Sequence, residues 1–160
     1  MYAVTLTESY FPAQKDGLLE SLTIGDMLRR SAARHGDALA LQEVRLDGSY
    51  GRSWSYRALL DDAERLGRAL AARHAKGARI AVWANNTPEW ILLELAAALA
   101  GVTLVTVNPS YQARELKYVL EQSRSEALYY VASVRGNPMK AIADEVASQR
   151  GEAAGYGPGS

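Results

Sequence analysis

The sequence contains no cysteine, which excludes a disulfide framework, a thiolate metal site and a cysteine nucleophile, and which agrees with a reducing compartment. The 18 basic and 18 acidic residues cancel, so the overall charge does not indicate nucleic acid or an anionic membrane as a partner. The most membrane-like stretch, Leu95 to Val107, is too short to span a bilayer and is divided by Gly101. Residues 1–17 have neither the cationic start nor the apolar core of a secretory leader. We therefore expect a cytoplasmic protein with no membrane span.

Motifs for phosphate, metal and nucleophilic chemistry are also absent. Neither Gly-x-x-x-x-Gly-Lys-Ser/Thr nor Gly-x-Gly-x-x-Gly occurs in the sequence. The acids Asp61, Asp62 and Glu64 fall on the polar face of a predicted helix, so we interpret them as a solvated surface and expect no metal site. His35 and His74 lie near the ends of predicted helices, where an imidazolium interacts favourably with the macrodipole. We interpret both as helix caps and expect no catalytic residue.

The amino-acid composition, with 48% hydrophobic and 22% charged residues, is typical of one globular domain. Residues 1–21 show no clear period, and we expect an irregular N-terminal arm there. Residues 22–150 carry the periodic segments and form the predicted domain. Residues 151–160 contain four glycines and one proline without an apolar period, which predicts a flexible Gly-rich tail.

Short apolar runs alternate with helical patterns in the second half of the domain. The predicted strands are 79–84, 102–107 and 127–131. Between the first two, Thr87 and Pro88 form the start of a helix that ends at Gly101. Strands connected through helices pair in parallel, so this alternation predicts an α/β fold with a doubly wound, mainly parallel sheet.

The first half of the domain adds two helices and a hairpin. Thr23 and Asp26 have the spacing of a capping box, and the helix that they begin ends at Gly36. Two alternating runs flank Asp47 and Gly48, which is typical of a β-hairpin. A long helix is predicted from Ser55 to about His74, and a last helix follows Pro138. The whole is predicted to be a partial three-layer sandwich with an N-terminal β-hairpin.

Several separated patterns resemble the start of the adenylate-forming (AMP-binding) acyl-CoA synthetases, and the fatty-acyl-CoA ligases in particular. The patterns are Trp54-Ser-Tyr56, Asn86-x-Pro88-Glu-Trp90, Ala100-Gly101-x-x-Leu-Val-Thr-Val-Asn108-Pro109 and Glu115-Leu-x-Tyr-x-Leu120-x-x-Ser123. They occur in the family's order, and the resemblance runs from Leu22 to Val146. It implies the family's reaction, in which a carboxylate is adenylated by ATP with Mg and then transferred to CoA.

The resemblance also implies that parts of the family's machinery are missing here. The family's phosphate loop and its catalytic Lys lie beyond the matched region, and no equivalent occurs in this sequence. We therefore expect an N-terminal fragment of a fatty-acyl-CoA ligase that is inactive alone, and we assign no cofactor to the fragment itself. A frameshift, a premature stop and a shortened gene model each explain why the phosphate loop and the catalytic Lys are missing, and the sequence does not choose among them. The alternative function is a non-catalytic binding remnant that pairs with another chain through an exposed sheet edge.

Ligand-contacting residues are expected at the carboxyl ends of the parallel strands. The candidates to line an acyl or pantetheine channel are Asn86, Trp90, Asn108 and Tyr111. We favour a structural interpretation of this region, in which Thr87 and Ser110 cap helices and the asparagines form turns. Trp90, in the first turn of an apolar helix, is expected to be part of the core.

Overall fold

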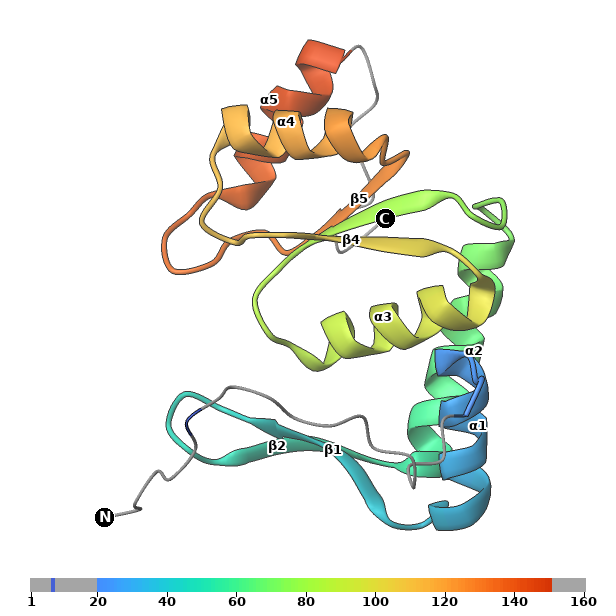
Figure 1. Ribbon diagram of the computed structural model, residues 1–160. Coiled ribbons are helices and arrows are strands. Elements are labelled where there is room, and N and C mark those ends of the chain that lie inside the picture. Colours follow the sequence, from blue (N-terminus) through green and yellow to red (C-terminus); the bar gives the residue numbers. More distant parts are fainter. Residues whose placement is uncertain (1–6, 8–19, 151–160) are drawn as a thin grey trace.

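The computed structural model describes residue 7 and residues 20–150, and it is an α/β structure (Figure 1). The predicted tail and most of the predicted arm lie outside the described residues. The elements follow the order α1 (Ile24–His35), β1 (Leu39–Val44), β2 (Tyr50–Ser55), α2 (Tyr56–Ala71), β3 (Arg79–Trp83), α3 (Pro88–Ala100), β4 (Thr103–Val107), α4 (Ala113–Ser123), β5 (Ala127–Tyr130) and α5 (Met139–Arg150). The predicted fold class is confirmed.

The three later strands form one parallel sheet in the order β4-β3-β5. Arg79 to Trp83 of β3 pair in register with Thr103 to Val107 of β4 on one side. On the other side, Ile80 to Trp83 pair with Ala127 to Tyr130 of β5. The antiparallel hairpin β1-β2 is a separate sheet. The strand that is central to the parallel sheet is therefore the first of the three in the sequence.

Successive residues of β3 pack against two different helical layers, because side chains alternate between the faces of a sheet. Ile80 and Val82 join the core that is formed with α2 and α3. Ala81 and Trp83 join the core that is formed with α4 and α5. All four side chains are at most 3% exposed, so β3 is buried on both faces, as a central parallel strand must be. Figure 1 shows α3 below this sheet and α4 and α5 above it.

Helix α3 is apolar around most of its circumference because it contacts two cores. Leu93 and Ala96 face the sheet. Leu92, Leu95 and Leu99 pack against the cluster that links α1, α2 and the hairpin, which is formed by Leu28, Trp54, Leu59 and Ala63. In Figure 1, α3 lies between the parallel sheet and the hairpin. The helix therefore connects the hairpin unit to the rest of the domain.

Most predicted helix ends are confirmed by the caps. Thr23 and Asp26 form the capping box of α1. Thr87 caps α3, which ends at Gly101 with φ of 70°. The predicted end of α2 near His74 is wrong, because the helix ends at Ala71.

The last residues of the predicted α2 helix instead form turns. The backbone N–H groups of Arg73 and His74 both donate to the carbonyl of Leu70.

None of the helices in residues 20–150 has the length and apolar character that crossing a membrane requires.

Candidate functional site

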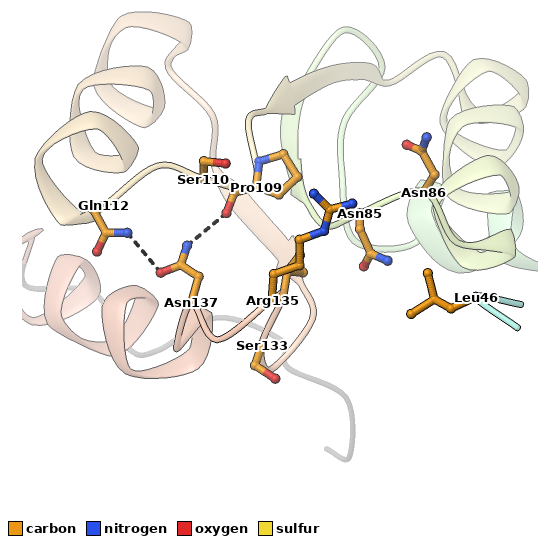
Figure 2. A pocket seen from close by; sticks show the side chains of 10 residues that line it. Leu46, Asn85, Asn86, Pro109, Ser110, Gln112, Ser133, Arg135 and Asn137 are labelled. Atoms are coloured by element: carbon orange, nitrogen blue, oxygen red, sulfur yellow. Dashed lines mark hydrogen bonds between the residues drawn. The ribbon is translucent and has the colours of Figure 1, made fainter.

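A cleft of about 740 Å³ lies at the carboxyl edge of the parallel sheet. The loops that follow β3, β4 and β5 line most of it, and the tip of the β1-β2 hairpin adds one side chain. The lining residues are Leu46, Asn85, Asn86, Pro109, Ser110, Gln112, Ser133, Val134, Arg135 and Asn137. Figure 2 shows these side chains around the opening. This is the edge at which open α/β sheets bind ligands.

A second groove of about 430 Å³ adjoins the cleft. It runs between β1 and the start of α3, and it shares Leu46, Asn85 and Asn86 with the cleft. Leu41, Val44 and Ile91 give this groove apolar walls. The two hollows together form a polar region at the strand ends that continues into a more apolar groove under the hairpin.

Asn137 holds two of the cleft loops together. Its Nδ2 donates to the carbonyl of Pro109 at 2.9 Å and to the carbonyl of Tyr111 at 3.2 Å. Gln112 Nε2 donates to Asn137 Oδ1 at 3.0 Å, and Figure 2 shows the Asn137 contacts with Gln112 and Pro109 as dashed lines. One amide therefore joins the loop after β5 to the loop after β4.

The loop after β4 is also held from inside the sheet. The indole Nε1 of Trp83 donates to the carbonyl of Asn108 at 2.9 Å. The side chain of Asn108 accepts a hydrogen bond from the backbone N–H of Ser110 at 2.9 Å, which is the turn geometry expected of an asparagine. The prediction that Ser110 caps a helix is wrong, because the N-cap of α4 is Gln112.

A tight turn after β5 brings Arg135 to the cleft. The backbones of Val134 and Asn137 exchange hydrogen bonds of 3.2 and 2.8 Å, and the two residues between them both have positive φ, 49° at Arg135 and 82° at Gly136. Glycine adopts this region freely, but an arginine is strained there. The turn is therefore one that favours Gly, and it carries an arginine at the position facing the cleft.

The electrostatic character of the cleft is positive. Arg135 is the only charged side chain among the described residues that line it. The helices α3, α4 and α5 all begin at this edge, and the N-terminus of a helix carries a partial positive charge. The acids of the first turns are already bonded, because Glu89 pairs with Arg52 and Glu115 accepts from the backbone N–H of Gln112. The cleft is thus suited to an anionic group.

Arg52 joins the hairpin to the start of α3. Its guanidinium lies 2.5 Å from Glu89 Oε1 and 3.1 Å from Glu43 Oε2, and it stacks 5.4 Å from the ring centre of Trp54. The hydrogen bonds from Arg52 hold the pKa of both carboxyl groups below the ordinary value. Both carboxylates stay charged at neutral pH, and this ion-pair network positions the wall of the second groove.

The four candidate residues have different positions. Asn86 lines both hollows. Trp90 is half-buried and packs against the core of α2 and α3, where the structural interpretation puts it. Tyr111 is half-buried against the core of α4 and α5. Asn108 forms its turn beside the cleft. A role for any of them in binding stays a prediction.

The two histidines differ from each other. His35 is the last residue of α1, as expected of a residue near a helix end. His74 is buried, and its ring bonds Glu126 Oε1 at 2.6 Å and the Tyr129 hydroxyl at 3.0 Å. It therefore links the turn after α2 to β5 and does not cap the helix. This cluster lies at the start of β5, at the edge of the sheet opposite the cleft.

The acid cluster on α2 is not simply solvated. Asp62 accepts from the indole Nε1 of Trp54 at 2.9 Å and pairs with Arg65, and Glu64 pairs with Arg29 at 3.2 Å. Across the described residues, no three His, Asp or Glu side chains gather into a group that could hold a metal ion. Asp62 and Glu64 therefore connect α2 to the hairpin and to α1, while Asp61 is exposed.

The site candidates predicted from the sequence lie in and after the loops that follow the first two strands, so they do not include Ser133, Arg135 and Asn137. A signal was present, because the Arg-Gly pair 135–136 lies in the loop that follows the third strand of the sheet. The bonds from Asn137 to residues more than 20 positions away had no local signal.

Comparisons with known proteins agree on one family. The family model described as AMP-binding enzyme matches residues 28–155. The human mitochondrial medium-chain acyl-CoA ligase ACSF2 is 34% identical over 137 residues, which cover 80% of this chain and 21% of ACSF2. ACSF2 of Danio rerio is 32% identical over 125 residues, with 78% and 20% covered. The chain thus spans about a fifth of the length of the curated relatives it matches.

Solved structures give the same result for the fold. The structure of a Mycobacterium tuberculosis fatty acyl CoA synthetase superposes with a TM-score of 0.70 at 26% identity, over 84% of this chain and 26% of that chain. The residues matched by the family model include the whole parallel sheet and every loop that lines the cleft. The chain therefore belongs to the AMP-binding enzyme family, and its similarity within that family is to the acyl-CoA ligases.

Proposed function

We propose that this chain supplies the N-terminal part of the catalytic domain of an ATP-dependent, AMP-forming fatty-acyl-CoA ligase. The observation that carries the proposal is the match of residues 28–155 to the AMP-binding enzymes, because it spans the parallel sheet and the cleft at its carboxyl edge. The similarity to medium-chain acyl-CoA ligase ACSF2 supports a fatty acid as the substrate. ATP, Mg and CoA are the corresponding cofactors and co-substrate.

The proposed reaction has two halves. The fatty-acid carboxylate attacks the α-phosphate of ATP, which forms an acyl-adenylate and releases pyrophosphate. The CoA thiol then attacks the acyl carbonyl, which forms the thioester and releases AMP. Both steps need cations close to the phosphates. Within residues 20–150, the cleft offers one cation, Arg135, and the starts of three helices.

We further propose that the chain has no ligase activity by itself. Phosphoryl chemistry of this kind depends on positioning groups and a metal around the reacting phosphate. The described residues bring no metal-binding group and no second cation to the cleft. The role proposed for this chain is therefore to build one wall of a site that further residues complete.

A chimera tests the proposal directly. In human ACSF2, the segment that matches this chain is replaced by residues 28–150, and acyl-CoA formation from medium-chain fatty acids is measured by the release of AMP. We expect a soluble chimera to retain activity within about tenfold of ACSF2, while the isolated 160-residue chain releases no AMP above background. A chimera that unfolds cooperatively but forms no acyl-CoA would contradict the proposed role. AMP release by the isolated chain would contradict its proposed inactivity.

Two further expectations remain predictions. A cytoplasmic location is expected from the sequence, although the related ACSF2 proteins are named as mitochondrial. Pairing with another chain is expected at the outer edges of the sheet, since β4 and β5 each have only one neighbouring strand among the described residues. Light scattering on the purified chain measures whether this pairing occurs between its own copies.

A further inference from the structure

We propose that Arg135 anchors a phosphate group in the cleft at the carboxyl edge of the sheet. The inference rests on the proposed function for the source of that phosphate, because ATP and CoA are its phosphate-bearing ligands. The binding itself follows from the geometry and charge of the cleft and can be measured without turnover.

Arg135 brings an uncommitted positive charge to the cleft. It forms no hydrogen bond and no ion pair with any described residue, and it is the only charge among those that line the cleft. Figure 2 shows its side chain extending from the turn toward the side of the cleft formed by Asn85. A guanidinium that faces a hollow without an acid is ready to pair with the oxygens of a phosphate.

Uncommitted polar side chains line the cleft together with this guanidinium. The side chains of Asn85, Asn86, Ser110 and Ser133 line the same cleft and hydrogen-bond to no described residue. Amide N–H and hydroxyl groups both donate to phosphate oxygens. A cleft that combines one arginine, free donors, no carboxylate and three helix N-termini matches a phosphate better than it matches a cation or an apolar ligand.

The turn holds the backbone of Arg135 in place at a conformational cost. Arg135 has φ of 49°, and Asn137 ties the turn to the neighbouring loop through Pro109 and Tyr111. These ties set the point at which the exposed Arg135 side chain leaves the backbone beside the cleft.

The chain offers a matched control for this residue. Arg124 is the C-cap of α4, and it also has a positive φ, of 54°. It is exposed and lies before β5, at the edge of the sheet opposite the cleft. Like Arg135, Arg124 is exposed, so replacing either arginine with Gln removes one exposed positive charge from a left-handed position, but only Arg135 lines the cleft.

The experiment titrates pyrophosphate, ATP and CoA into the full 160-residue chain, with binding measured by calorimetry and by amide chemical shifts. We expect saturable binding with shifts in residues 85–87, 108–112 and 133–137. Arg135→Gln should weaken binding at least tenfold, because a charge-assisted bidentate contact is lost, and Arg135→Lys should weaken it less. Arg124→Gln should bind like the unchanged chain.

Each outcome decides the proposal. Binding of all three probes supports a general phosphate site, while binding of only ATP or only CoA supports the site and identifies its source. No saturable binding to the unchanged chain would overturn the proposal, as would equal affinity of Arg135→Gln or an equal loss in Arg124→Gln. An inactive ACSF2 chimera together with intact phosphate binding would refute the ligase role while leaving this site supported.

Discussion

Asn137 should be the polar side chain on which the shape of the cleft depends most. Asn137→Ala removes the two hydrogen bonds donated to Pro109 and Tyr111 and the one accepted from Gln112. At roughly 0.5–1.5 kcal/mol for each bond, and with Asn137 only half-buried, we expect a loss of about 2 kcal/mol in the free energy of unfolding. In a chain of this size that corresponds to a fall in Tm of about 4–8 °C.

Asn137→Asp should be more destabilising than Asn137→Ala at pH 7. Its carboxylate would face the carbonyl oxygens of Pro109 and Tyr111, which adds repulsion and leaves both carbonyls unpaired. These oxygens would raise the pKa of the new carboxyl group in the folded state above its unfolded value. The penalty is therefore greatest at neutral pH and decreases as the pH falls and the acid becomes protonated.

Urea unfolding at pH 7 and pH 4, followed by tryptophan fluorescence, measures both Asn137 variants. Asn86→Asp is the matched control, because Asn86 is exposed, lines the same cleft and hydrogen-bonds to no described residue, so its stability should change by less than about 0.5 kcal/mol. If Asn137→Asp is no less stable than Asn137→Ala at pH 7, or if its deficit does not decrease at pH 4, the role given to the Asn137 amide is wrong.

Three further predictions concern the turns, the hairpin and the core. Arg135→Gly and Arg124→Gly should each raise the free energy of urea unfolding by about 0.5–1 kcal/mol, because glycine relieves the positive φ. Arg52→Gln should lower the thermal midpoint at pH 7. Its deficit should begin to shrink only near pH 4.5 and should disappear at lower pH, because Arg52 lowers the folded-state pKa of both Glu89 and Glu43 and the stabilisation is lost as the pH falls through those lowered values. Leu116→Ala should cost about 2–5 kcal/mol in urea unfolding, since Leu116 is fully buried between α4 and the sheet.

The sequence by itself determined the order of elements and most of their ends. Caps and stops act over three or four residues, so Thr23 with Asp26, Thr87 with Pro88, and Gly101 could be interpreted without tertiary information. The alternation of apolar runs with helical patterns likewise determined the α/β class. The family resemblance rested on the same segments, because its motifs coincide with these strand ends and helix starts.

The tertiary structure alone decided which strand is central and which side chains meet. Packing on both faces of β3 requires the order β4-β3-β5, and no local pattern states this order. His74 lies outside its predicted helix, and its ring bonds Glu126, which is 52 residues later in the sequence. The cleft is assembled from three loops in the same way, since parallel strands bring their carboxyl ends to one edge. Arg135 and Asn137 acquire their roles only there, because their surroundings come from residues that are distant in sequence and adjacent in the fold.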